Sequence, residues 1–171
     1  MDIYASDDEK GEEIKQWWRD NGRAVIIGIV FGTALIFSGR YWLNYQTTLT
    51  EQASLNYQHL ATSLLDDNNA EADEKVQQLF SEFSSTPYAV FAAFDMAKKA
   101  VERDDAEAAK SYLQWVIDHA ELTGHISIAQ LRLSELLLSE SKLDQALELV
   151  IQPTSVSFTS LFSEVRGDIL V

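Results

Sequence analysis

The chain has 171 residues, with 27 acidic and 13 basic side chains and a formal net charge of −14. Because a negative field repels phosphates, this balance argues against nucleic acid as a partner. The absence of cysteine excludes disulfides, thiol catalysis and zinc–thiolate sites. With two prolines, seven glycines and weak strand patterns, the sequence predicts an all-α protein.

The N-terminal 23 residues are polar and carry several charges. Residues 1–12 are acidic and are predicted to be disordered. Residues Glu13–Arg23 place Ile14, Trp17 and Trp18 on one side of a short helix, which suits a membrane–water interface. We therefore interpret residues 1–23 as a tail with an interfacial helix.

The run Ala24–Gly39 contains no charge and no proline, and Arg23 and Arg40 flank it. As a helix it covers about 24 Å at 1.5 Å per residue, and the arginine side chains can extend to the lipid headgroups. Aromatic residues lie at both ends, as in the interfacial belts of a spanning helix. The run predicts a transmembrane helix over residues 24–43, with these membrane anchors: Trp17, Trp18, Arg23, Arg40, Tyr41 and Trp42.

Two other interpretations of this run are a cleaved signal peptide and a buried core helix. The long acidic N-terminal region and the absence of a small-residue cleavage site argue against the signal peptide. The charge-free faces with arginine at both ends argue against the core helix. Basic residues precede the run at Lys10, Lys15, Arg19 and Arg23, whereas the next one after Arg40 is Lys75. The positive-inside rule then predicts a cytoplasmic N-terminus and a periplasmic C-terminal domain, the arrangement of a type II inner-membrane protein.

Glycine also marks one face of the predicted span. Gly28 and Gly32 form a G-x-x-x-G pair, and Gly39 lies seven residues beyond. Such pairs let two membrane helices approach closely, although glycine is common in membrane helices in general. The pattern predicts helix–helix packing within the membrane at Gly28, Gly32 and Gly39.

Residues 44–171 are long enough for one compact domain. Past Asn44 the chain has 20 acidic and 8 basic residues, a net charge of about −12, which keeps a helical domain soluble. Apolar periodicity predicts helices at 41–65, 70–83, 88–102, 106–119, 127–140, 144–151 and 158–170, with turns at 66–69, 104–105 and 141.

The last five of these helices follow a repeating pattern. Ala97 and Ala109 are 12 residues apart, as are Ser134 and Ala146, and the two pairs are offset by 37 residues. Small residues at both positions let the helices of a hairpin pack closely, as in tetratricopeptide repeats. A third unit opens at residues 158–170, with Gly167 at the small position. The pattern predicts two and a half such repeats; the alternative is a generic amphipathic bundle.

In this register the first helix of each hairpin lines a groove that can bind a partner. The residues expected there are Phe91, Phe94, Lys98, Val101, Ile128, Leu131, Glu135 and Leu138. The alternative is that a terminal helix of this chain fills the groove. Catalytic or metal-binding patterns are not found, since the spacing of His59, His119 and His125 matches no ligand motif and no phosphate loop or nucleophile elbow occurs. We expect no enzyme activity and no cofactor.

Several short stretches resemble the YfgM family of ancillary subunits of the bacterial SecYEG translocon. They are Met1-Asp2-Ile3-Tyr4, Trp17-Trp18-Arg19-Asp20-Asn21-Gly22-Arg23, Gly39-Arg40-Tyr41-Trp42 and Ala53-Ser54-Leu55-Asn56-Tyr57. The resemblance covers nearly the whole chain and is most specific over residues 17–57. It implies an inner-membrane anchor and a periplasmic tetratricopeptide-like domain. It also implies partnership with SecYEG and the periplasmic chaperone PpiD, and a link to the response regulator RcsB through the cytoplasmic tail.

The sequence therefore predicts a non-enzymatic, membrane-anchored adaptor that links the Sec translocon to periplasmic chaperones for newly translocated proteins. The alternatives are a tetratricopeptide scaffold of another envelope complex, in cell-wall or outer-membrane assembly, and a membrane-tethered enzyme. In one respect the chain departs from the family pattern. It ends at Asp168-Ile169-Leu170-Val171, within the first helix of its third unit, where family members continue with a second helix. A solenoid that ends on an unpaired helix exposes an apolar face, so we expect a fragment or a different C-terminus.

Overall fold

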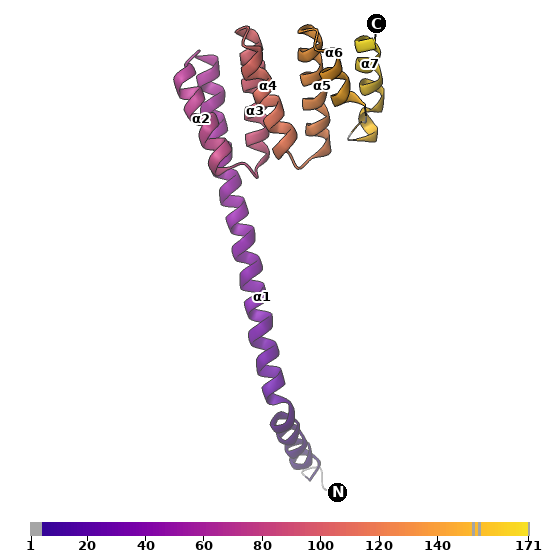
Figure 1. Ribbon diagram of the computed structural model, residues 1–171. Helices are drawn as coiled ribbons and strands as arrows, with labels where there is room; N and C mark the ends of the chain where they lie inside the picture. The colour runs from indigo at the N-terminus through magenta and orange to yellow at the C-terminus, as the bar shows by residue number, and fades with distance from the viewer. Residues whose placement is uncertain (1–4, 152, 154, 171) are drawn as a thin grey trace. The chain divides into compact units, whose positions relative to one another are not determined.

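The computed structural model of the protein describes residues 5–151, 153 and 155–170, and every element in these ranges is helical. The elements are α1 (Ala5–Leu65), α2 (Asn69–Glu82), α3 (Pro87–Glu102), α4 (Ala106–His119), α5 (Thr123–Ser139), α6 (Leu143–Val150), the 3₁₀ helix η1 (Val156–Phe158) and α7 (Thr159–Leu170) (Figure 1). The prediction of an all-α fold is confirmed.

The chain divides into two compact units, Met1–Thr47 and Thr48–Val171. Helix α1 begins at Ala5, so the predicted disorder of residues 1–12 is wrong from Ala5 onward, and residues 1–4 lie outside the described part. The physical reason is that a helix, once formed, extends by one hydrogen bond per added residue, so a polar segment joined to a long helix can continue it at little cost.

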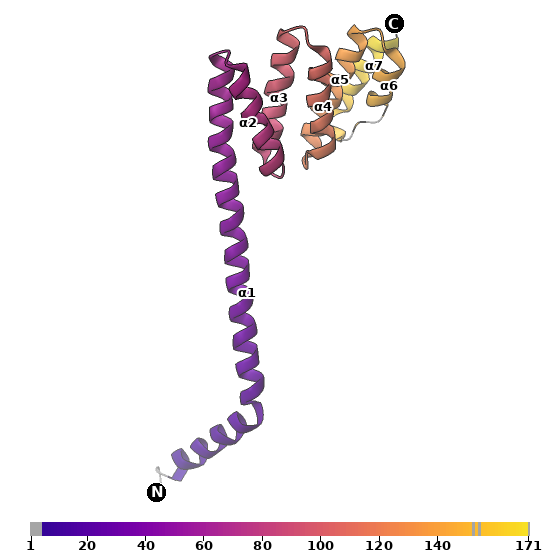
Figure 2. The same ribbon diagram turned by 60° about the vertical axis from the view of Figure 1, so that its left-hand side comes forward.

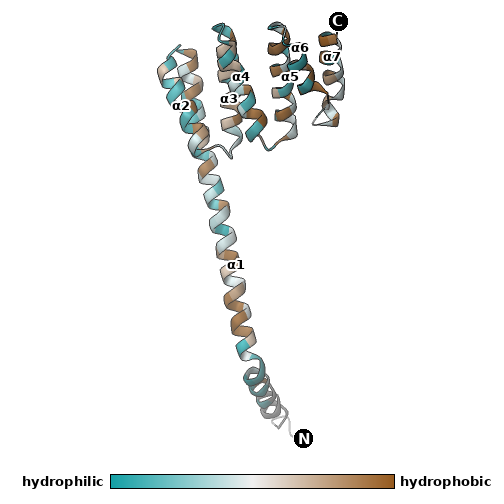
Figure 3. Cartoon of the chain, viewed as in Figure 1, coloured by the Kyte–Doolittle hydropathy of each residue, from teal (hydrophilic) through white to brown (hydrophobic). Residues whose placement is uncertain are grey.

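The apolar run lies inside α1, where Figure 3 shows a continuous hydrophobic stretch. Among the described residues one helix, Ile14–Leu65, is long and apolar enough to cross a membrane, by length and composition alone. Only 6% of its most apolar 18-residue window is buried within the protein. The Thr33 hydroxyl donates to the carbonyl of Ile29 at 2.7 Å, so this polar group is satisfied within the helix.

Unit Thr48–Val171, called here the hairpin domain, contains three helical hairpins followed by α7, one hairpin more than the predicted two and a half repeats. Their turns have positive φ at Asp67 (53°), Asp104 (60°) and Ser141 (60°), and these positions are 37 residues apart. Aspartate tolerates this left-handed conformation better than most residues. The extra hairpin consists of the end of α1 with α2, and Figures 1 and 2 show α3 to α7 following it in chain order.

Small buried residues bring the two helices of each hairpin together, as the spacing predicted. Ala97 and Ala109 are 4% and 0% exposed, and Ser134 and Ala146 are both fully buried. In the first hairpin Ala72 takes the position equivalent to Ala109, also fully buried. An alanine is therefore buried at the same position of the second helix in all three hairpins.

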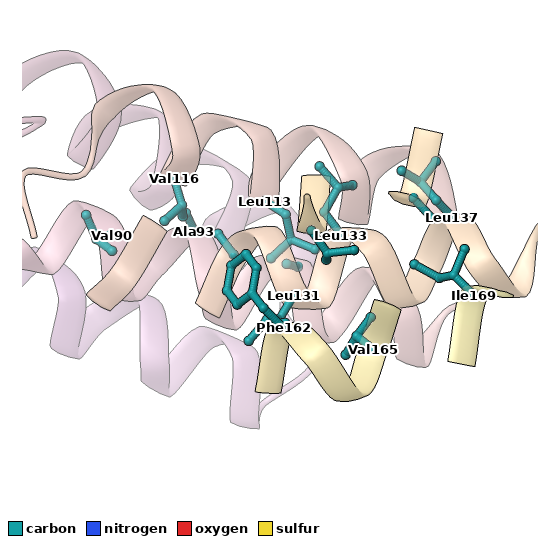
Figure 4. Packing of buried hydrophobic residues seen from close by; sticks show 14 residues of the cluster. Val90, Ala93, Leu113, Val116, Leu131, Leu133, Leu137, Phe162, Val165 and Ile169 are labelled. Atoms are coloured by element: carbon teal, nitrogen blue, oxygen red, sulfur yellow. The ribbon is translucent and has the colours of Figure 1, made fainter. Parts of the chain in front are cut away.

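Two adjoining hydrophobic cores hold the domain together. One contains Ala53, Leu60, Val76, Leu79, Phe83 and Met96, among others, and joins α1, α2 and α3. The other contains Val90, Leu113, Val116, Leu131, Leu133, Leu137, Phe162, Val165 and Ile169, among others, and joins α3 to α7. Figure 4 shows Phe162 of α7 beside Leu131 of α5, so α7 closes the second core.

Local signals fix several helix starts. The Asn68 side chain accepts a hydrogen bond from the Glu71 amide at 3.4 Å, and that of Asp105 from the Ala108 amide at 3.0 Å. These side chains satisfy amides that have no partner within the first turn of a helix. Pro87 is the first residue of α3, a position where its missing N–H costs nothing.

Ion pairs join neighbouring hairpins at the exposed ends of the helices. Lys110 Nζ lies 2.8 Å from Glu140 Oε2 and 2.6 Å from Glu107 Oε1, and Lys142 Nζ lies 2.7 Å from Glu140 Oε2. The Lys110 and Lys142 ammonium groups lower the pKa of the Glu140 carboxyl, and the Glu107 and Glu140 carboxylates raise the pKa of Lys110. This cluster connects the second hairpin to the third.

Candidate functional site

The residues predicted for the first unit of the groove lie along one side of α3. Phe91 and Val101 are 39% and 49% exposed. Phe94 is half-buried, and Lys98 is exposed with its ammonium 3.8 Å from Glu102. Exposed apolar side chains grouped in this way are typical of a surface that binds a partner.

The residues predicted for the second unit lie on α5, and one of them is buried. Ile128 and Leu138 are half-buried and Glu135 is exposed, but Leu131 is only 8% exposed. Leu131 belongs to the second core, where Phe162 of α7 lies beside it (Figure 4). Helical periodicity assigns a residue to a face, whereas its burial depends on which later helix of the chain covers that face. At this position α7 covers α5, and the groove itself stays a prediction.

Five ring-bearing side chains form a continuous surface. Phe91 and Phe94 were predicted from the sequence, and the other three were not. The surface contains Tyr57 of α1, Tyr88, Phe91 and Phe94 of α3, and His125 of α5, and we call it the aromatic surface.

Phe91 lies at the centre of the aromatic surface. Its ring centroid is 6.2 Å from that of Tyr57, 6.1 Å from Tyr88 and 5.8 Å from His125, in edge-to-face geometry. Such contacts are favourable and hold the rings in place. At one end, the guanidinium carbon of Arg132 lies 5.1 Å from the centroid of Phe94, a cation–π contact that leaves a positive charge on the surface.

Tyr57 also makes the polar contact that ties α1 to α3. Its hydroxyl donates to Asp95 Oδ2 at 2.7 Å. Burial, followed by this hydrogen bond and the nearby Asp95 charge, raises the pKa of Tyr57 to about 12. Beside this contact is a cavity of about 470 Å³, lined by Ala61, Leu64, Leu65, Asp67, Asp95, Lys98, Lys99 and Glu102. The cavity therefore continues the aromatic surface from Tyr57 toward the end of α1.

The 37-residue period could have revealed the contribution of α1. Moving back 37 residues from Phe91, Phe94, Lys98 and Val101 gives Ser54, Tyr57, Ala61 and Leu64, the same face of the preceding hairpin. The sequence predicted these residues as a helix but did not count them as a repeat.

Two histidines of the hairpin domain, His119 and His125, lie against aromatic rings. No group of three or more His, Asp or Glu side chains within the described part could hold a metal ion. His119 stacks on Trp115 with centroids 4.5 Å apart, and its Nδ1 lies 2.9 Å from the Trp115 carbonyl. His125 belongs to the aromatic surface. Both histidines thus pack against aromatic rings.

The residues predicted to act in the membrane all lie on α1. A Cβ added at Gly28, Gly32 or Gly39 would have no neighbour within 4 Å. The aromatic anchors are exposed, from 51% for Trp18 to 76% for Tyr41, and both flanking arginines are exposed too. These surfaces are free to contact lipid or another helix.

Comparison with known proteins decides the family. The model of a tetratricopeptide repeat-like domain matches residues 15–171. The chain is also 33% identical over all of its 171 residues to the ancillary SecYEG translocon subunit of Haemophilus influenzae, covering 83% of that protein. The chain belongs to the YfgM family of ancillary SecYEG translocon subunits.

Two further members of the family are also similar. The subunit of Escherichia coli is 24% identical over the whole of this chain and 82% of its own length. That of Aggregatibacter actinomycetemcomitans is 30% identical over 91% of this chain and 76% of its own length. No solved structure matches the chain significantly. The resemblance inferred from residues 17–57 is therefore confirmed, and the YfgM family member described here carries its tetratricopeptide-like fold as three hairpins and α7.

Proposed function

We propose that the chain is a non-enzymatic, membrane-anchored adaptor of the bacterial Sec translocon. The observation that carries the proposal is 24–33% identity, over 91–100% of this chain, to proteins named as ancillary SecYEG translocon subunits. A tetratricopeptide-like domain supports an adaptor role, since such repeats present extended surfaces to partners. The aromatic surface supplies the apolar area for such a contact.

In this proposal α1 anchors the protein in the inner membrane, with residues 1–23 in the cytoplasm and the hairpin domain in the periplasm. The basic residues before the apolar run support that orientation. The open glycine face at Gly28, Gly32 and Gly39 would pack against a spanning helix of the translocon. The tail would be the segment available to a cytoplasmic partner such as RcsB. Reporter fusions at each terminus test the orientation, and a periplasmic N-terminus would refute it.

The aromatic surface would bind a periplasmic chaperone of the PpiD type. Edge-to-face contacts already fix the rings, so little conformational entropy is lost when a partner covers them. Phe91 is the most informative position, because its ring is the centre of the surface and remains 39% exposed.

The test compares Phe91→Asp with Leu161→Asp, a matched change at a 47% exposed leucine of α7. Each full-length variant is isolated from membranes in mild detergent, and the SecY and PpiD that accompany it are quantified. We expect Phe91→Asp to lose PpiD and keep SecY, and Leu161→Asp to keep both. A folded Phe91→Asp variant that retains PpiD would refute the role of the surface. Recovery of cell-wall or outer-membrane assembly proteins in place of SecY would favour the scaffold alternative.

A further inference from the structure

A second cavity lies away from the aromatic surface. It has a volume of about 730 Å³ and lies between α4 and α6, with residues of α5 also lining it. We call it the α4/α6 groove. None of the residues of the aromatic surface lines it, so its chemistry can be considered separately.

The floor and one wall of this groove are apolar and fixed in position. Leu133 and Leu137, one helical turn apart on α5 and only 6% and 7% exposed, form the floor, and the half-buried Leu149 contributes from α6. Trp115 forms the wall on α4. Its ring is stacked between Phe80, at 4.0 Å between centroids, and His119, at 4.5 Å. A tryptophan held on both faces presents a preformed edge to a ligand.

The charged side chains that line the groove leave it negative. Lys110 is ion-paired with Glu107 and with Glu140, so its charge is already balanced. Asp118 accepts a hydrogen bond from Gln114 at 2.9 Å but has no cationic partner in the described part of the chain. Glu148 on the α6 side likewise forms no ion pair there. One unpaired carboxylate thus borders each side of an apolar floor.

The length and walls of the groove match a helix. Its α4 side runs from Lys110 to His119, a rise of about 14 Å, or about two and a half turns. Two helices separated by a floor of leucines at i and i+4 accept the ridge of apolar side chains of a third helix. An extended segment would fit less well, because side chains on alternate residues would point away from the leucines.

We propose that the α4/α6 groove binds an amphipathic helix of a partner protein, whose apolar stripe packs on the half-buried Trp115 and Leu149, above the floor formed by Leu133 and Leu137. Lysine or arginine residues on both flanks of that stripe pair with Asp118 and Glu148. Because the groove shares no residue with the aromatic surface, the adaptor can hold two partners at once. This second binding surface does not depend on the identity of the first partner.

The probe is a pair of synthetic peptides of about 14 residues, long enough to begin forming a helix. Both carry the same leucine stripe, and their polar faces are built from lysine in one and glutamate in the other. Binding to the full-length protein in non-ionic detergent is measured by fluorescence anisotropy. The key variant is Asp118→Lys/Glu148→Lys. The matched control is Glu164→Lys/Asp168→Lys, which changes the net charge by the same amount at exposed positions of α7.

We expect the lysine peptide to bind the unaltered protein more tightly than the glutamate peptide. Reversal of two exposed ion pairs should weaken its binding by about tenfold in the groove variant, and the α7 control should leave it unchanged. Phe91→Asp should also leave it unchanged. Equal weakening of peptide binding in both double variants would show attraction to net charge alone and would overturn the proposal. Peptide binding that is lost in Phe91→Asp but kept in Asp118→Lys/Glu148→Lys would overturn it too.

Discussion

Leu113 is the residue whose removal best tests the second core. It lies on α4, is 2% exposed, and is one of the largest fully buried side chains of the domain. Leu113→Ala removes three carbons from this core, which at about 0.8 kcal/mol per methylene lowers the free energy of unfolding by about 2.4 kcal/mol. The cavity left behind adds to this loss, so we expect a total of about 3–4 kcal/mol.

The measurement is urea unfolding of the full-length protein in detergent, followed by tryptophan fluorescence. Trp115 is the one tryptophan of the hairpin domain, and it stacks against Phe80, so its emission reports on this packing. With a slope of about 2 kcal/mol per molar urea, the midpoint should fall by about 1.5–2 M.

The control for this experiment is Leu143→Ala, at a leucine of α6 that is 47% exposed. Leucine and alanine have similar helix propensities. The two substitutions therefore differ mainly in how much buried apolar area is lost and in whether a cavity is left behind. We expect little change in the midpoint for the control. A shift for Leu113→Ala no larger than that of Leu143→Ala would refute the packing of α4 in the second core.

Three further predictions concern polar groups. Tyr57 should titrate near pH 12 in an absorbance titration, and Asp95→Asn should bring its pKa back toward 10 by removing the charged acceptor. Titration of Tyr57 near its ordinary pKa of 10 in the unaltered protein would contradict the contact with Asp95. The pKa of Glu140 is lowered in the folded state, so the stability that its ion pairs provide is present above the ordinary pKa of 4.5 and is lost as the pH falls further. The free energy of unfolding should therefore change less between pH 5 and pH 3 in Glu140→Gln than in the unaltered protein, and identical changes would count against the ion pairs. Asp105→Ala should lower the free energy of unfolding by about 1 kcal/mol, whereas Asp105→Asn should cost less in the same urea experiment, because asparagine also caps helices.

The sequence predicted the second and third hairpins because their turns and small residues are separate local signals. Ala97 with Ala109, and Ser134 with Ala146, occupy the crossing points, and each pair is buried. The first hairpin has the same turn, at Asp67, but Leu60 replaces the small residue of its first helix. That helix also has no start signal, because α1 begins at Ala5 and continues to Leu65 without a break. Periodicity therefore identified the helix but not its place in the repeat.

Side-chain contacts between repeats could not be predicted in the same way. Phe91 meets Tyr57 and His125, which lie 34 residues on either side of it in the sequence. The sequence specifies which face of each helix carries the rings. The distance between faces depends on how closely successive hairpins pack, and that is set by side chains on the other faces of the same helices.

Equivalent positions in the three repeats change in character along the domain, and this change locates the candidate site. Tyr57, Phe94 and Leu131 are 37 residues apart. The first two are half-buried members of the aromatic surface, whereas Leu131 is buried beside Phe162. Solvent access to this face is thus lost where α7 covers α5. A partner that needs apolar area should bind across α1 and α3 and reach α5 only near His125, one hairpin closer to the N-terminus than the groove predicted from the sequence.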